Sequence, residues 1–308
     1  MQIYHTDHFV LPLPEGHRFP MSKYARLRER VLAAGIVPPH ELVEPAPATE
    51  AQLTRAHDAA YVERVFEGRL LQQEQRRIGF PWSPAMVERA RRSVGATLGA
   101  ARAALREGFG VNLAGGTHHA YADRGEGYCI FNDVAVTIRC LQHEGLIRKA
   151  VVFDCDVHQG NGTAAIFCDD ASVFTFSVHG ANNFPFRKED SSLDIALPDR
   201  AGDAEYLAAV AAGVAAAGAA GPFDIAFYLA GADAHERDRL GRLNVSMSAL
   251  AERDAMVLAS CASQQWPVVV VMAGGYGSDV DETVTIHLNS VLTAASLCER
   301  GIPTSTMR

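Results

Sequence analysis

The segment that most constrains the fold covers residues 150–163 and reads AVVFDCDVHQGNGT. Its β-branched and aromatic start predicts a buried parallel strand, which polar residues and a glycine turn follow at once. Side chains two residues apart lie on the same side of an extended backbone, so Asp154, Asp156 and His158 should share one side. Ligands of open α/β sheets bind beyond the carboxyl ends of the strands, and this segment therefore predicts a functional site.

The spacing D-x-D-x-H suits a metal ion. Two carboxylates and one imidazole can bind Zn²⁺ if a second strand end supplies one of the carboxylates, which leaves a position open for water. A strand that ends in a solvated acidic turn would show the same spacing, so these three residues alone leave both interpretations open. The choice depends on the residues that follow the other strands.

A regular alternation of strand, glycine-rich turn and helix begins near residue 111. The expected strands are 111–114, 150–156, 173–178, 225–230 and 268–272, and the expected helices are 133–144, 203–217, 248–261 and 282–297. Helices between strands imply a parallel sheet that is covered on both faces. The fold class is therefore α/β, and because no linker, repeat or low-complexity segment interrupts the chain, residues 1–308 are expected to form a single domain.

Residues 1–4 are compatible with an opening strand, and the rest of the first 110 residues is expected to be mostly helical. Ser22 is expected to cap a helix over 23–34 that Gly35 closes, and short helices are expected at 50–55 and 58–67. A longer helix should begin with Ser83 as its cap and Pro84 at its first position and should continue to about residue 107.

Each of the five predicted strands is followed by residues whose side chains can bind a metal ion or take part in catalysis. These are His118 and His119, then Asp154, Asp156 and His158, then Ser177 and His179, then Asp233, and finally Tyr276. One polar turn is ordinary, but five turns on one parallel sheet would meet along one edge. Asp156, His158 and Asp233 are the best zinc ligands among them, because they come from two strand ends and leave room for water and substrate.

The remaining polar residues at this edge have roles in an amide hydrolysis. His118 and His119 supply a general base and a general acid or electrostatic partner, with Asp154 and Asn161 as candidates for orienting the two rings. Tyr276 stands on a Gly-Gly turn and can donate its hydroxyl to an oxyanion. Each residue alone is more often structural, but the complete set predicts a catalytic metal site.

Composition excludes several classes of function. The formal charge is −8, there are only three lysines, and the arginines are scattered, so nucleic-acid binding is not expected. An acidic chain could meet basic partners, although a modest negative charge also serves solubility alone. Six cysteines without C-x-x-C spacing indicate reduced thiols, and no signal or membrane-spanning pattern is present, so a cytoplasmic protein without a membrane partner is expected.

The motifs resemble those of the zinc-dependent histone deacetylase superfamily, whose fold is shared with arginase. They are GGTHHA at 115–120, GYCIFND at 127–133, the segment 154–162, AGAD at 230–233 and GGY at 274–276, in the order of that family. The resemblance covers residues 80–297 and implies zinc at Asp156, His158 and Asp233, a catalytic pair at His118 and His119, and transition-state stabilisation by Tyr276.

Two motifs, HQGNG at 158–162 and DRLGRL at 238–243, resemble class IV histone deacetylases and their bacterial relatives. Class I members usually carry aspartate at the position of Asn161. A neutral amide in place of a carboxylate should leave His119 less readily protonated.

The resemblance also implies further ligand sites. A structural monovalent cation, K⁺, would be held by Asp154, Ser177 and backbone carbonyls of Asp156, His158 and Val178, and a second cation by Phe167, Asp170 and Val173. A substrate tunnel would be lined by Gly127, Tyr128, Phe184 and Leu240, because the stem of an acyl-lysine is a narrow apolar chain.

The implied activity is removal of acyl groups from the ε-amine of lysine in proteins or peptides. One alternative is an acetylpolyamine amidohydrolase of the same fold, which would need acidic groups at the tunnel mouth; another is a catalytically silent acyl-lysine binding protein. Class IV relatives are associated with longer acyl chains, and the small residues at 114–116 and 273–275 either leave room for such a chain or merely permit tight turns. The oligomeric state is not indicated by the sequence.

Overall fold

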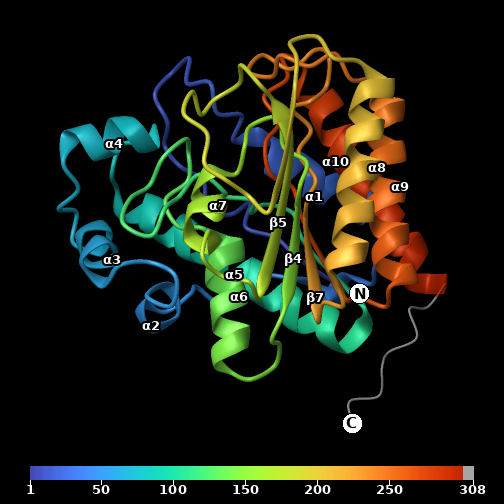
Figure 1. The fold of residues 1–308 in the computed structure, drawn as a ribbon. Coiled ribbons are helices and arrows are strands. Elements are labelled where there is room, and N and C mark those ends of the chain that lie inside the picture. Colours follow the sequence, from blue (N-terminus) through green and yellow to red (C-terminus); the bar gives the residue numbers. More distant parts are fainter. Residues whose placement is uncertain (301–308) are drawn as a thin grey trace.

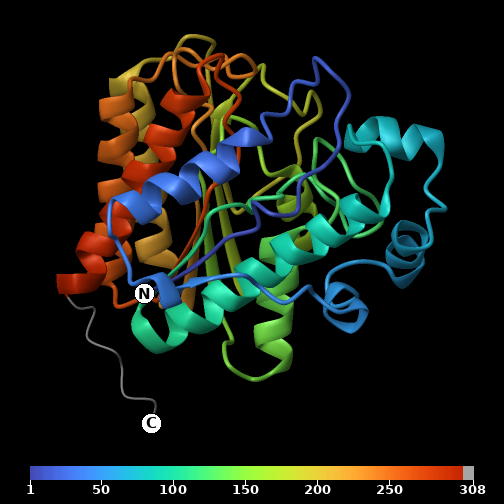
Figure 2. The ribbon, with the colours of Figure 1, turned by 180° about the vertical axis from the view of Figure 1, so that it is seen from behind.

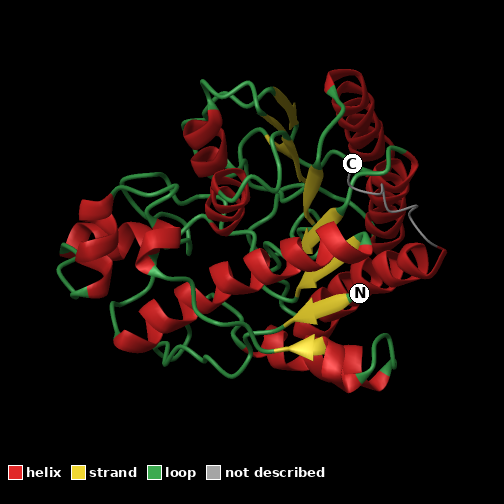
Figure 3. Ribbon diagram, turned by 90° about the horizontal axis from the view of Figure 1, so that it is seen from below, coloured by secondary structure: helices red, strands yellow, loops and turns green. Residues whose placement is uncertain are grey.

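One parallel β-sheet lies at the centre of the molecule, with helices on both faces (Figure 1). The structure is a computed structural model, and it describes residues 1–300. Within these residues, eight strands pair in the order β2-β1-β3-β8-β7-β4-β5-β6, and every neighbouring pair is parallel. The α/β fold class expected from the sequence is confirmed. Figure 3, which views the molecule from below, shows the strands as one twisted sheet between helices.

The bounds of the elements are as follows. The strands are β1 (Gln2–Tyr4), β2 (Leu42–Val43), β3 (Phe109–Asn112), β4 (Ala150–Asp154), β5 (Val173–Gly180), β6 (Leu193–Leu197), β7 (Ile225–Leu229) and β8 (Val268–Val271). The α-helices are α1 (Ser22–Ala33), α2 (Glu50–Leu53), α3 (Ala59–Phe66), α4 (Gln72–Ile78), α5 (Pro84–Glu107), α6 (Asp133–His143), α7 (Asn161–Phe167), α8 (Asp203–Ala220), α9 (Met247–Ser263) and α10 (Val280–Arg300), and a short 3₁₀ turn covers Pro39–Glu41.

The sheet separates two apolar cores. Val151 and Phe153 of β4 pack in the core under α8, α9, α10 and α1, whereas Ala150 and Val152 pack in the core under α5 and α6. Because alternate side chains of a strand point to opposite faces, strands covered on both faces are apolar throughout, as the VVVV of β8 illustrates. Figure 2 shows α1 and α5 from behind, and α1 packs against α10.

Several predicted bounds were wrong. The strand expected at 111–114 is shifted by two residues to Phe109–Asn112. The other four expected strands begin at the expected residue and end within two residues of the expected position, and β2, β6, α4 and α7 were not predicted. Ser22 does not cap α1: it is the first helical residue, and no side-chain hydrogen bond caps the helix. Ser83 does cap α5, with its hydroxyl accepting a hydrogen bond from the Met86 N–H at 3.1 Å. No described helix is long and apolar enough to cross a membrane.

A buried ionic network lies between α9, α10 and the end of β7. The side chain of Arg253 is fully buried; its guanidinium donates to the Gly231 carbonyl at 2.6 Å and to Asp254 Oδ1 at 2.8 and 3.1 Å. Asp254 also accepts from the hydroxyls of Tyr228 and Ser290. Every charged atom therefore has a partner, and the turn that follows β7 is fixed to helix α9.

We expect Arg253→Ala to lower the free energy of unfolding by about 3–5 kcal/mol, because it leaves the buried Asp254 carboxylate without its counter-charge. Urea-induced unfolding measures the change. Arg237→Ala is the matched control: Arg237 pairs with Glu282 but its side chain is 63% exposed, so the loss should stay within about 1 kcal/mol. Equal losses for the two variants would contradict the role given to burial.

Candidate active site

The polar residues expected at the strand ends meet at one edge of the sheet. Strands β3, β8, β7 and β4 are consecutive neighbours, so the turns that follow them are adjacent. Each turn contributes part of the site: His118 and His119 after β3, Tyr276 after β8, Asp233 after β7, and Asp154, Asp156 and His158 at the end of β4. Their side chains are buried or nearly so.

Asp156, His158 and Asp233 form a compact, buried group of potential metal ligands. One ligand atom from each lies within 4.8 Å of the others. His158 Nδ1 lies 2.9 Å from Asp156 Oδ1 and 3.2 Å from Asp233 Oδ2, yet a single N–H can serve only one of these oxygens. Asp233 Oδ2 consequently accepts no hydrogen bond although it is buried, which is a costly state for a carboxylate oxygen. A cation between the three side chains would satisfy it.

The charges of this group also require a cation. Burial, and then the nearby Asp156, raises the pKa of Asp233 to about 7. Burial lowers the pKa of His158, but the carboxylates of Asp156 and Asp233, which both lie beside its Nδ1, outweigh that effect and raise the pKa to about 10. The two carboxylates thus demand a positive charge at Nδ1, and a divalent metal ion in place of the proton fits the donor set.

Gly274 allows the backbone after β8 to approach both carboxylates. Its N–H donates to Asp156 Oδ2 at 2.7 Å. A Cβ atom at this position would lie 1.9 Å from Asp233 Oδ2 and 2.5 Å from Asp156 Oδ2, which no side chain can tolerate. The glycine is therefore required by contact with the candidate ligands.

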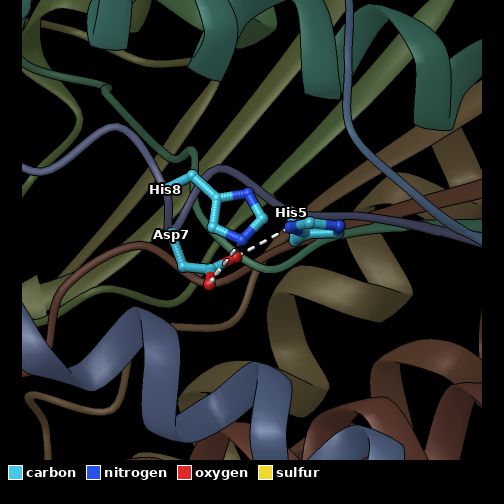
Figure 4. A group of neighbouring side chains, drawn as sticks. All are labelled: His5, Asp7 and His8. Atoms are coloured by element: carbon cyan, nitrogen blue, oxygen red, sulfur yellow. Dashed lines mark hydrogen bonds and ion pairs between the residues drawn. The ribbon is translucent and has the colours of Figure 1, made fainter.

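A second group of potential ligands, His5, Asp7 and His8, follows strand β1 (Figure 4). Here the carboxylate is already compensated: His5 Nδ1 lies 2.7 Å from Asp7 Oδ1, and Arg28 Nη1 lies 3.6 Å from Asp7 Oδ2. Burial opposes ionisation, but His5 and Arg28 outweigh it and hold the pKa of Asp7 below its ordinary value. Because the arginine supplies the positive charge, we assign no metal to this group.

The two adjacent histidines have different partners. His118 Nδ1 lies 2.7 Å from Asp154 Oδ2, and His119 Nδ1 lies 2.6 Å from Asn161 Oδ1. The amide of Asn161 is itself oriented, because its Nδ2 donates to the Tyr121 hydroxyl at 2.9 Å. The ring centroids of the pair are 4.1 Å apart. Both imidazoles are thus fixed in direction by a neighbouring side chain.

These partners give the histidines opposite charge states. Burial lowers the pKa of His118, but Asp154 and Asp156 outweigh it and raise the pKa to about 9. Burial, reinforced by the positive charges of His118 and His158, holds the pKa of His119 well below its ordinary value. At neutral pH the pair therefore combines a charged imidazolium with a neutral imidazole.

Tyr276 is positioned through its backbone. Its N–H donates to Asp238 Oδ2 at 2.6 Å, and its carbonyl accepts from Arg239 Nε at 2.7 Å. Lys23 is 2% exposed and donates to the carbonyls of Ala273 and Gly275, both at 3.3 Å. Burial, and then Asp156 and Asp233, raises the pKa of Tyr276 well above its ordinary value, so its hydroxyl stays protonated and can donate.

Two cavities share lining residues at this site. The outer one has a volume of about 550 Å³ and is lined by His119, Gly127, Tyr128, Phe184, Leu240 and Tyr276, among others. The inner one is smaller, about 60 Å³, and its lining combines polar residues such as Arg89 and Ser93 with the apolar Leu11, Phe19, Phe80, Met86, Ala90 and Phe131. Gly127, Tyr128, Phe184 and Leu240 therefore all lie at the opening, where the resemblance places a tunnel.

Sequence reasoning missed the contribution of the N-terminal segment. Phe19 packs against Phe80 with ring centroids 5.0 Å apart and against Tyr128 at 5.2 Å, and it lines the inner cavity. Lys23 was assigned only to a helix. The aromatic residues in the proline-rich loops at 9–20 and 78–84 were the available signal, because solvated loops seldom carry so many.

Asp154 and Ser177, the residues whose side chains are expected to hold a monovalent cation, are register partners on the paired strands β4 and β5. The Ser177 hydroxyl lies 2.9 Å from His179 Nδ1. At the second expected cation site, the Phe167 carbonyl accepts from the Asp170 N–H and the Asp170 carbonyl accepts from the Val173 N–H. Two successive turns therefore connect these three residues.

Comparison with known proteins gives a consistent result. The histone deacetylase domain family matches residues 17–292. An uncharacterized protein of Picosynechococcus is 41% identical over 92% of this chain and 95% of its own length. Histone deacetylase 2 of Arabidopsis thaliana is 27% identical over 84% of this chain and 70% of its own length. The crystal structure of a histone deacetylase homologue in complex with SAHA, 23% identical, superposes with a TM-score of 0.83 over 97% of this chain and 84% of that one.

Proposed function

Since this chain belongs to the histone deacetylase family, and this membership supports a hydrolase of the deacetylase type, we propose that it is a zinc-dependent hydrolase that removes acyl groups from the ε-amine of lysine in proteins or peptides. The observation that carries the proposal is the buried Asp156, His158 and Asp233 group with its unpartnered carboxylate oxygen. Two oriented histidines and a tyrosine hydroxyl surround the same cavity.

Zinc held by Asp156, His158 and Asp233 would acidify a water molecule and polarise the amide carbonyl. His119 is the proposed general base. Because its Nδ1–H points at Asn161 Oδ1, the neutral ring carries its lone pair on Nε2, where it can take a proton from water and later return it to the departing lysine nitrogen. His118, charged through Asp154, would stabilise the negative charge that develops on the carbonyl oxygen. The Tyr276 hydroxyl would donate to the same oxygen.

The outer cavity favours acyl-lysine over acetylpolyamine as the substrate. A polyamine needs carboxylates at the opening to hold its second amine, and none of the residues that line the described cavity is acidic. A silent binding protein is the other alternative. It has no need of the carboxylate pair that demands a cation, nor of a neutral histidine next to a charged one.

We also propose that K⁺ is bound by Asp154, Ser177 and the neighbouring backbone carbonyls, as the family resemblance implies.

All six cysteines lie in the described part of the chain as free thiols, which supports our assignment of the protein to the reducing cytoplasm.

We expect Asp156→Ala and Asp233→Ala each to lower bound zinc from about one ion per chain to nearly none and to abolish activity, because tight binding of zinc requires all three ligands. Metal analysis of the dialysed protein measures the change, and circular dichroism checks the fold. Asp7→Ala is the matched control and should keep its zinc. Full zinc occupancy in both site variants would mean that the ligands are wrongly assigned.

We expect Tyr276→Phe to lower turnover by about 10²- to 10³-fold, the range for loss of one oxyanion donor. Zinc content and the Kd of a hydroxamate inhibitor should change little, because the ring, which packs against Phe19 and Tyr128, remains. Steady-state kinetics on one acyl-lysine peptide give the comparison. Near-normal turnover would limit the hydroxyl to a positioning role.

The inner cavity supports a preference for acyl groups longer than acetyl. Its volume of about 60 Å³ corresponds to room for roughly two water-sized groups at about 30 Å³ each. Each buried methylene could contribute up to about 0.8 kcal/mol, so kcat/KM should rise from acetyl to a chain about two carbons longer and fall once the cavity is full.

A peptide series that differs only in the acyl group measures this preference. Ala90→Leu places a larger side chain in the inner cavity and should abolish the advantage of the longer chains while acetyl hydrolysis continues. A steady decline in kcat/KM from acetyl onward in the unmodified protein would refute the preference.

A further inference from the structure

The opening of the outer cavity is lined by arginines. Five of them, Arg18, Arg76, Arg77, Arg239 and Arg242, are exposed there, and no aspartate or glutamate lines the same described cavity. The whole chain, in contrast, carries a formal charge of −8. The local charge at the opening is therefore opposite in sign to that of the molecule.

Most of these arginines lack a carboxylate partner. Only Arg242 has one within ion-pair distance, Asp199 at 3.3 Å, when residues 1–300 are considered. Arg239 is held in place by backbone carbonyls, with Nε donating to Tyr276 at 2.7 Å and Nη2 donating to Arg18 at 3.2 Å. Its positive charge is thus oriented but not neutralised. An arginine fixed in this way presents its remaining N–H groups to a carboxylate at little cost in side-chain entropy.

The arginines reach the opening from three separate segments. Arg18 belongs to the loop before α1, Arg76 and Arg77 to the last turn of α4, and Arg239 and Arg242 to the loop after β7. Charges distributed around an opening match several anionic groups on an extended ligand better than one compact anion. Two phenylalanines complete the opening: Phe184 contacts the ring of His119, and Phe186 is 87% exposed.

We propose that this arginine rim (Arg18, Arg76, Arg77, Arg239 and Arg242) selects acyl-lysine segments in which aspartate or glutamate residues flank the modified lysine. The inference rests on the proposed function, because the acylated side chain occupies the apolar channel past Tyr128 and the flanking residues stay outside. Acylation removes the charge of the lysine itself, so the flanking residues alone determine the electrostatic interaction. Acidic flanks are attracted by the rim, whereas the lysine-rich flanks of a histone-like tail are repelled.

Kinetics and binding on matched peptides test the rim. Three peptides carry the same acyl-lysine and differ only in flanks of Asp and Glu, of Asn and Gln, or of Lys and Arg. We expect kcat/KM at low salt to be about tenfold higher for the acidic than for the basic peptide, and the difference to shrink at high ionic strength, where exposed charges are screened. Fluorescence anisotropy of labelled peptides gives Kd in parallel.

A pair of charge-matched double variants locates the effect. Arg76→Gln with Arg77→Gln should reduce the ratio of acidic to neutral kcat/KM several-fold. Arg148→Gln with Lys149→Gln removes the same charge at the amino end of β4, the opposite end of the strand from the site, and should leave the ratio unchanged. All four residues are exposed, so both variants should fold.

The outcomes separate the two proposals. Hydrolysis of all three peptides with equal or basic-favouring efficiency would overturn the rim and leave the proposed function intact. Hydrolysis of none would overturn the proposed function, and the Kd values would then decide the rim by themselves: tighter binding of the acidic peptide supports it, and equal binding refutes it. Inhibition by inorganic phosphate as strong as that by the acidic peptide would also refute it, since a compact anion would then suffice.

Discussion

Two carboxylates buried side by side are the constraint on which the site depends. Asp156 and Asp233 come from the neighbouring strands β4 and β7, share the imidazole of His158, and leave one oxygen without a partner. Like charges in a low-dielectric interior repel strongly, so the fold must supply a cation or keep a proton there. The backbone accommodates this need: Gly274 brings an N–H to Asp156, and the Val157 N–H donates to Asp233 at 2.9 Å.

The parallel sheet explains why this polar group forms at the carboxyl edge. Both faces of the sheet pack against the apolar sides of helices, so the carboxyl ends of the strands are where ligand-binding side chains can meet a cavity. Within this buried group, two neighbouring histidines differ in their charge states. Asp154 and Asp156 outweigh the effect of burial on His118 and raise its pKa, whereas burial and the positive charges of His118 and His158 lower the pKa of His119, because the neutral amide of Asn161 supplies no counter-charge. Two adjacent histidines thus differ in their chemistry.

Local patterns predicted the parts of the fold that local patterns determine. The period of two at 150–158 identified β4, and Ser83 before Pro84 identified the start of α5, because each signal lies within a few residues. Lys23 was missed because its partners, the carbonyls of Ala273 and Gly275, are about 250 residues away in the chain. Strand β6 was missed because LDIAL is half-exposed at the edge of the sheet and carries an aspartate.

Net charge illustrates the same limit at the scale of the whole molecule. A value of −8 suggested basic partners, but it does not describe the field at the opening, where arginines from three distant segments gather without a carboxylate in the described lining. Screening confines exposed charges to about 8–10 Å at physiological salt, so a ligand at the opening senses these arginines more than the acidic remainder of the surface. The fold alone brings Arg18, Arg76 and Arg239 together, and it therefore determines the sign of the charge that a substrate meets.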